Sequence, residues 1–131
     1  MNKLLSVRIA SYGLLLMFSL ILVFHFFVLA GIIPFAIVWG GRIKDSSELV
    51  VFETFSITIN FLMIFVVGVK AGLVKLKWNP RFIEISLWLM FVLFFVNTMG
   101  NLFSLNQWEK IIFTPITIVL AIFSLRLALS N

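Results

Sequence analysis

Four long stretches that hold very few charged residues limit what this chain can fold into. The first runs from Tyr12 to Trp39, and the others cover residues 49–69, 82–102 and 111–129. A helix needs about 20 predominantly apolar residues to cross the hydrocarbon core of a bilayer. The sequence therefore predicts an all-α membrane protein whose four transmembrane helices, about 12–39, 49–69, 82–102 and 111–129, form an antiparallel bundle.

The composition agrees with this class of protein. Hydrophobic residues make up 63% of the chain, charged residues 11%, and the mean hydropathy is +1.20. A small soluble domain could not bury so much apolar surface. The 131 residues are therefore expected to form a single transmembrane domain, residues 1–131, surrounded by membrane lipids.

The first stretch is longer than one crossing requires, so we expect it to tilt or to kink near Pro34 and to end at Gly40 and Gly41. Its basic start, "MNKLLSVR", is typical of a signal sequence. The apolar run is too long for a cleaved signal, however, and no clear small-residue cleavage site follows it. We interpret it as a retained transmembrane helix.

Local signals mark where the later helices begin. Asp45 followed by Glu48 has capping-box spacing and predicts the start of the second helix. Asn79-Pro80 predicts the break before the third helix. In the fourth, Pro115 is expected in the first turn, where a proline leaves no hydrogen bond unmade.

Lysine and arginine are distributed unevenly between the two sides of the predicted bundle. If the N-terminus is cytoplasmic, seven basic residues lie inside and three outside, and cytoplasmic loops favour basic residues. The inner set is Lys3, Arg8, Lys70, Lys75, Lys77, Arg81 and Arg126, and the outer set is Arg42, Lys44 and Lys110. Both termini are thus expected to be cytoplasmic. The net charge of +5 would face anionic lipid and gives no case for nucleic-acid binding.

A set of polar residues falls in the middle or the outer half of the predicted spans. On the second helix, Glu53, Ser56 and Asn60 recur at three and four residues and so share a face. Asn97, Asn101 and Ser104 do the same on the third helix. The candidate polar cluster comprises His25, Arg42, Glu53, Asn60, Asn97 and Asn101.

Glu53 is expected to be shallow, neutralised or paired inside the bundle, because a charged side chain at the bilayer centre costs about 2.5 to 3.5 kcal/mol on insertion scales. The candidate partners are His25, Arg42, Lys44 and Asn101. Asn60 and Asn97 lie at similar depth, so a hydrogen bond between them is also expected. The fourth helix carries a stripe of small residues that predicts a packing seam with another helix. The stripe comprises Thr114, Thr117, Ala121, Ser124 and Ala128.

The sequence holds no pattern typical of an enzyme, a metal site or a bound cofactor. It has no cysteine, and the single His25 has no carboxylate at the fixed spacing of a metal motif. No nucleophile with an adjacent base can be recognised. For the asparagines and threonines, interhelical hydrogen bonding is the favoured interpretation, and for Glu53 a structural and a functional role are almost evenly balanced.

In small multidrug-resistance transporters the coupling carboxylate lies on the first helix, where this chain has only His25. The stretches "GIIPFAIVWGGRIK", "FETFSITIN", "NTMGNLFS" and "IFTPITI" resemble a group of small bacterial four-helix membrane proteins without a known activity. The resemblance covers most of the chain from His25 onward. It implies a multi-pass protein of the bacterial cytoplasmic (inner) membrane.

Two classes of function remain open. The favoured one is a non-catalytic subunit or interaction protein of a larger membrane assembly, with other membrane proteins or further copies of itself as partners. The alternative is a protein that binds or transports an ion or a small molecule. Its outward-facing pocket would be walled by Glu53, Asn60, Asn97 and Asn101. The inner half of the predicted bundle is almost purely apolar, whereas a transporter needs polar groups on both sides of the midplane.

Overall fold

The structure is a computed structural model and describes residues 5–33 and 45–130 of the chain. Within these ranges it contains four helices: α1 (Val7–Leu29), α2 (Ser46–Lys70), α3 (Pro80–Leu102) and α4 (Gln107–Leu129). All four are long and apolar enough to cross a membrane. The prediction of an all-helical chain with four such helices is confirmed for the described residues, which contain no strand.

Side-chain caps explain where three of the helices begin. The Asp45 side chain accepts a hydrogen bond of 3.0 Å from the amide of Glu48, as its spacing predicted. Asn79 caps α3 in the same way, with Pro80 in the first turn. Ser6 caps α1, which therefore begins five residues before the expected Tyr12.

The end of α1 corrects the prediction of a helix over residues 12–39. α1 ends at Leu29, and Gly31 follows with a φ of 83° that favours glycine. The amides of Gly31 and Ile32 donate to the carbonyls of Val28 and Phe27 at 3.1 and 2.9 Å, which forms a Schellman cap. The apolar run continues past the end of α1, and hydropathy alone therefore could not locate this helix end. The expected end at Gly40 and Gly41 and the kink at Pro34 lie outside the described residues.

The start of α4 corrects a second prediction. The Asn106 side chain accepts from the amides of Trp108 and Glu109 at 2.8 and 3.3 Å, and so α4 begins at Gln107 rather than near residue 111. Pro115 consequently lies inside the helix and not in its first turn. Because proline has no amide hydrogen, the carbonyl of Ile111 loses its usual partner in the helix.

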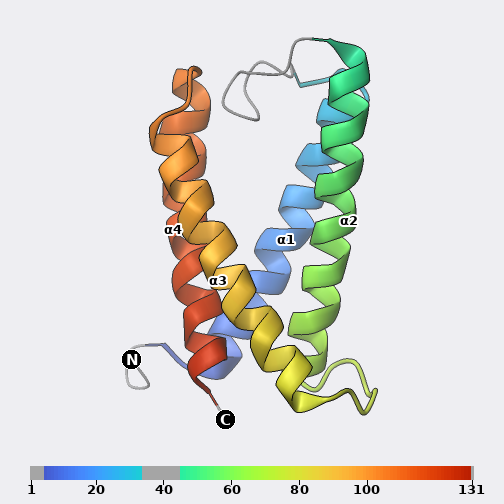
Figure 1. Ribbon diagram of the computed structural model, residues 1–131, viewed down its shortest axis with the longest axis vertical. Helices are drawn as coiled ribbons and strands as arrows, with labels where there is room; N and C mark the ends of the chain where they lie inside the picture. The colour runs from blue at the N-terminus through green and yellow to red at the C-terminus, as the bar shows by residue number, and fades with distance from the viewer. Residues whose placement is uncertain (1–4, 34–44, 131) are drawn as a thin grey trace.

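The four helices form two hairpins, α1–α2 and α3–α4 (Figure 1). The hairpins lie close together where α1 begins and α4 ends, and they diverge toward the opposite end. Two contacts join chain segments at the closed end. Arg126 Nε donates to the carbonyl of Leu5 at 2.7 Å, and Lys70 Nζ donates to the carbonyl of Ser130 at 3.2 Å.

The main hydrophobic core fills the closed half of the bundle. All four helices contribute to it: Ala10, Leu14 and Phe18; Met63, Val66 and Val67; Ile83, Leu87, Met90 and Phe94; Leu120, Ala121, Leu127 and Ala128. The rings of Phe18 and Phe94 stack across it with centroids 5.8 Å apart. The divergent half holds only a small cluster around Val28 and Leu49, which leaves space there for a pocket.

Candidate functional site

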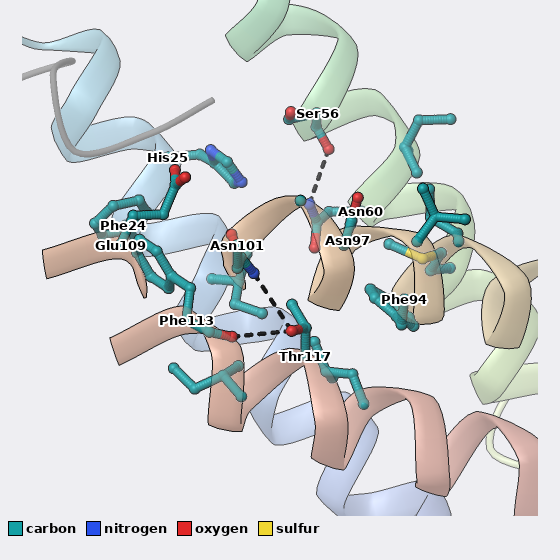
Figure 2. Close-up of a pocket in the computed structure, with 18 of the residues that line it drawn as sticks. Phe24, His25, Ser56, Asn60, Phe94, Asn97, Asn101, Glu109, Phe113 and Thr117 are labelled. Carbon is teal, nitrogen blue, oxygen red and sulfur yellow. Dashed lines mark hydrogen bonds between the residues drawn. The ribbon is translucent and has the colours of Figure 1, made fainter. Parts of the chain in front are cut away.

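A pocket of about 650 Å³ lies between the two hairpins in the divergent half of the bundle (Figure 2). Met63, Phe94 and Leu120 belong both to the core and to the pocket wall, and so form the boundary between them. Most of the wall is apolar, and four phenylalanines, Phe24, Phe55, Phe94 and Phe113, contribute to it. Its size is within the range of sites that enclose a small molecule.

The pocket collects most of the candidate polar cluster. Every helix adds at least one polar side chain to its lining: His25 from α1, Ser56 and Asn60 from α2, Asn97 and Asn101 from α3, Glu109 and Thr117 from α4. Arg42 and Lys44 lie outside the described residues.

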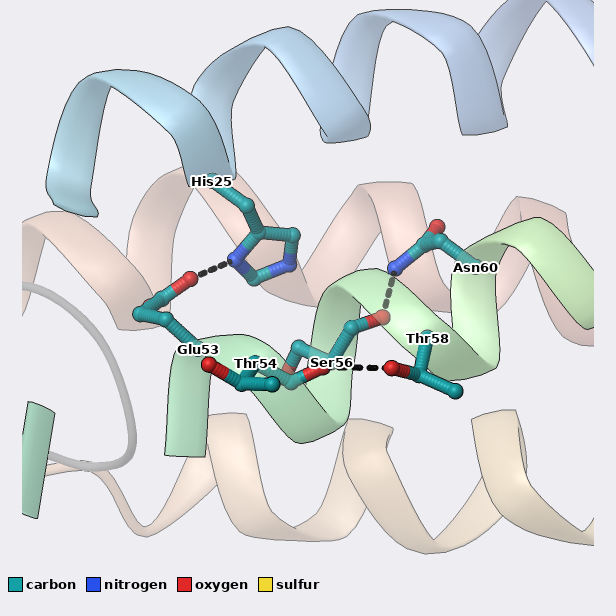
Figure 3. A network of polar contacts seen from close by, with 6 residues as sticks. All are labelled: His25, Glu53, Thr54, Ser56, Thr58 and Asn60. Atoms are coloured by element: carbon teal, nitrogen blue, oxygen red, sulfur yellow. Dashed lines mark hydrogen bonds and ion pairs between the residues drawn. The ribbon is translucent and has the colours of Figure 1, made fainter. Parts of the chain in front are cut away.

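Glu53 does not line the pocket but lies behind His25 (Figure 3). Its side chain is fully buried, and its Oε2 is 2.5 Å from His25 Nδ1. Of the candidate partners proposed for Glu53, His25 is the one that contacts it among the described residues. Glu53 Oε1 has no hydrogen-bond partner there. The ion pair or hydrogen bond therefore links α1 to α2 at the level of the pocket.

Asn60 and Asn97 do not form the expected hydrogen bond. Asn60 Nδ2 donates to the carbonyl of Ser56 at 2.8 Å, one turn earlier in α2. Its Oδ1 is buried and has no partner among the described residues. Asn97 is exposed, and the pocket that both residues line separates α2 from α3 at this depth.

Asn101 belongs to a small network between α3 and α4. Its Nδ2 donates to Thr117 Oγ1 at 3.3 Å, and Thr98 Oγ1 lies 2.9 Å from the same oxygen. The hydroxyl of Thr117 donates in turn to carbonyls of its own helix. The small-residue stripe of α4 is thus a packing seam within the bundle, where its five residues are buried.

Glu109 is a polar pocket residue that the sequence analysis did not single out. It lies in the first turn of α4, only 4% of it is exposed, and its carboxylate projects toward the side of the pocket that holds His25 (Figure 2). The expected start of the fourth helix at residue 111 left Glu109 in the loop before that helix. Asn106 followed three residues later by Glu109 is an N-terminal helix signal that could have placed it on α4.

The exposure of its lining residues indicates that the pocket opens between α2 and α3, two neighbouring helices with sparse mutual contacts. Five of its lining residues on these two helices are exposed: Phe55, Leu93, Val96, Asn97 and Gly100. Phe55 lies in the first half of α2, the other four lie past the midpoint of α3, and most of the five are apolar. The opening is therefore at the level of the apolar surface rather than at the polar end of the bundle.

The described residues contain no group of three His, Asp or Glu side chains placed to hold a metal ion. The pocket presents apolar walls, one imidazole in contact with a buried carboxylate, a second carboxylate and several amides. Comparisons with protein-family models, curated proteins and solved structures find no match for this chain.

Proposed function

We propose that this chain is a multi-pass protein of the bacterial cytoplasmic membrane that binds a small, largely apolar molecule in the pocket between its hairpins. The observation that carries the proposal is a pocket of about 650 Å³ onto which polar side chains from all four helices converge. Convergent polar groups within an apolar wall are typical of small-molecule sites.

The surface of the bundle supports membrane insertion. Large apolar side chains such as Leu16, Val51, Leu89 and Ile111 are more than half exposed on the four helices. The hydroxyls of Ser19, Thr58 and Ser86 donate to carbonyls four residues earlier in their own helices, at 2.8 to 2.9 Å. In hydrocarbon these groups have no water to bind, so such internal bonds are needed.

In the proposed arrangement the helices are antiparallel, and the closed end of the bundle faces the cytoplasm. Most lysines and arginines of the described residues lie at that end: Arg8, Lys70, Lys75, Lys77, Arg81 and Arg126. Lys110 lies at the other. The pocket then lies in the outer half of the membrane.

The interpretation as a subunit of a larger assembly has less support. The sequence favoured it because the inner half of the predicted bundle is almost purely apolar. The small-residue stripe of α4, one possible docking face, is already buried inside the bundle. A partner would have to bind another face.

Gly100 offers a direct test of the binding proposal. It lines the pocket, and a Cβ built on it meets no atom within 4 Å. Gly100→Phe should therefore fill the pocket without disturbing the fold. We expect native mass spectrometry of the protein, purified in mild detergent, to detect a bound small molecule that Gly100→Phe lacks and Gly100→Ala retains.

A lipid-facing control is Leu89→Phe, at an α3 position that is 64% exposed. It should retain the bound molecule. A native protein that carries no small molecule but copurifies with a stoichiometric larger protein would contradict the binding proposal and favour the subunit interpretation.

A further inference from the structure

The contact between Glu53 and His25 determines which atom of the imidazole faces the pocket. Nδ1 is 2.5 Å from Glu53 Oε2, and the ring turns its other nitrogen, Nε2, away from Glu53 (Figure 3). His25 lines the pocket, and Nε2 has no hydrogen-bond partner among the described residues. Nε2 is therefore the atom that this pair offers to a ligand.

The number of protons that Glu53 and His25 share determines whether Nε2 is a hydrogen-bond donor or an acceptor. Glu53 is fully buried and the His25 side chain is only 14% exposed, so a net charge on the pair would be costly. A neutral pair is either an imidazolium with a carboxylate or an imidazole with a carboxylic acid. In both cases the shared proton lies between Nδ1 and Oε2, and the second proton is on Nε2. The pair thus presents an N–H donor to the pocket.

The N–H donor on His25 favours some ligand charges over others. A neutral pair supplies no net positive charge, and no lysine or arginine occurs among the described residues of the pocket wall. Among the described residues an anion would therefore meet no counter-charge, and the Glu109 carboxylate would repel it. A cation would meet the positive end of this N–H dipole, but Glu109 adds a carboxylate to the same side of the pocket wall, and the amine probe below tests this alternative. A neutral hydrogen-bond acceptor suits the site best.

The opening between α2 and α3 indicates where such a ligand comes from. Phe55 and Val96, on facing helices of the opening, are 61% and 57% exposed. A molecule that passes between them crosses an apolar surface at the depth of the hydrocarbon core. It must therefore be soluble in lipid.

We propose that the pocket binds a lipid-soluble carbonyl compound, which reaches it from the bilayer between α2 and α3 and whose carbonyl oxygen accepts a hydrogen bond from His25 Nε2–H. This inference rests on the proposed binding function and gives the chemical class of its ligand. Glu53 acts as a positioning residue, because it holds the imidazole in the required tautomer and orientation.

The test uses the protein in lipid nanodiscs and three probes with the same apolar body. Benzophenone carries a carbonyl and attaches to nearby C–H bonds on irradiation, diphenylmethane lacks the oxygen, and diphenylmethylamine is a cation at neutral pH. We expect benzophenone to label peptides of the pocket wall. Diphenylmethane should bind roughly threefold to tenfold more weakly as a competitor, which corresponds to one net hydrogen bond. The carbonyl stretching band of bound benzophenone should move to lower frequency.

Two variants locate the donor. The double variant His25→Phe/Glu53→Leu removes both partners together and so strands no buried charge. It should bind benzophenone and diphenylmethane equally, with no shift of the carbonyl band. Glu53→Gln should keep the preference for benzophenone, because its amide N–H can donate to Nδ1 and leave the hydrogen on Nε2. Melting temperatures of both variants confirm that each is folded.

The outcomes separate the two proposals. If benzophenone does not label the pocket and neither diphenylmethane nor diphenylmethylamine binds there, the binding function itself is wrong. Two results would support the binding pocket and contradict the carbonyl inference: equal binding of benzophenone and diphenylmethane to the native protein, or a double variant that keeps the preference for benzophenone. The inference also falls if diphenylmethylamine binds most tightly, since that result indicates a cation site at one of the two carboxylates, Glu53 or Glu109.

Discussion

At the scale of single residues, the burial of Glu53 is the most demanding feature of this protein. A carboxylate without exposed surface must share a proton or a hydrogen bond, and His25 provides this from the neighbouring helix. The contact is a specific link between α1 and α2, because few other polar pairs join these helices among the described residues.

We predict that Glu53→Gln leaves the stability nearly unchanged and that Glu53→Leu lowers it by about 1 to 3 kcal/mol. Glutamine keeps a hydrogen bond to Nδ1, whereas leucine strands the buried nitrogen. Thermal or denaturant unfolding in detergent measures both. A double-mutant cycle with His25→Phe should show coupling, since the double variant removes both polar partners. Additive effects of the two single changes would show that the contact contributes nothing.

The sequence predicted part of this polar site. It placed His25, Asn60, Asn97 and Asn101 in the candidate polar cluster, because polar residues are rare and costly inside apolar spans. It also predicted Glu53 in the pocket wall, whereas Glu53 does not line the pocket. It could not choose His25 from among the partners of Glu53, since that choice depends on how α1 and α2 are rotated about their axes. It also missed Glu109, because the start of α4 was placed after that residue.

At the scale of helices, a glycine of α1, Gly13, lies against an aromatic ring of α4. A Cβ built on Gly13 would lie 2.4 Å from Cε2 of Phe123, which is too close for real atoms. The Phe123 ring thus occupies the space that a side chain at position 13 would need. Hydropathy predicted that both helices exist but could not predict this contact, because it depends on the packing of the tertiary structure.

Gly13→Ala and Gly100→Ala form a matched pair that tests the approach of α1 to α4. Both glycines lie inside helices, where alanine is favoured by about 0.5 to 1 kcal/mol. Gly100→Ala should show this gain, because its Cβ meets nothing within 4 Å. Gly13→Ala should instead lose stability, because overpacking costs about 1 to 3 kcal/mol and the helix propensity of alanine offsets only part of this cost. Melting temperatures give the comparison, and Gly13→Ala/Phe123→Leu should recover most of the loss. Equal effects of the two alanines would contradict the close contact.

At the scale of the whole molecule, the bundle divides into a packed half and a hollow half. The main core fills the end where α1 begins and α4 ends, and the pocket occupies the end where the hairpins diverge. Most basic residues of the described ranges lie at the packed end. If that end is cytoplasmic, the packed half seals the inner leaflet and the pocket communicates with the outer leaflet through the opening between α2 and α3.

This orientation can be tested because the chain has no native cysteine. Ser47, at the start of α2, and Lys75, between α2 and α3, are both exposed and lie at opposite ends of the bundle. With single cysteines at these positions, a membrane-impermeant maleimide should label Ser47→Cys in intact cells with the outer membrane permeabilised, but not Lys75→Cys. Both should react once the cytoplasmic membrane is disrupted, which serves as the control.

Labelling of Lys75→Cys alone would place the pocket in the inner leaflet, and labelling of both in intact cells would show that the chain inserts in two orientations. The positive-inside distribution favours the first result, because the basic side chains at the packed end bind anionic lipid and resist translocation.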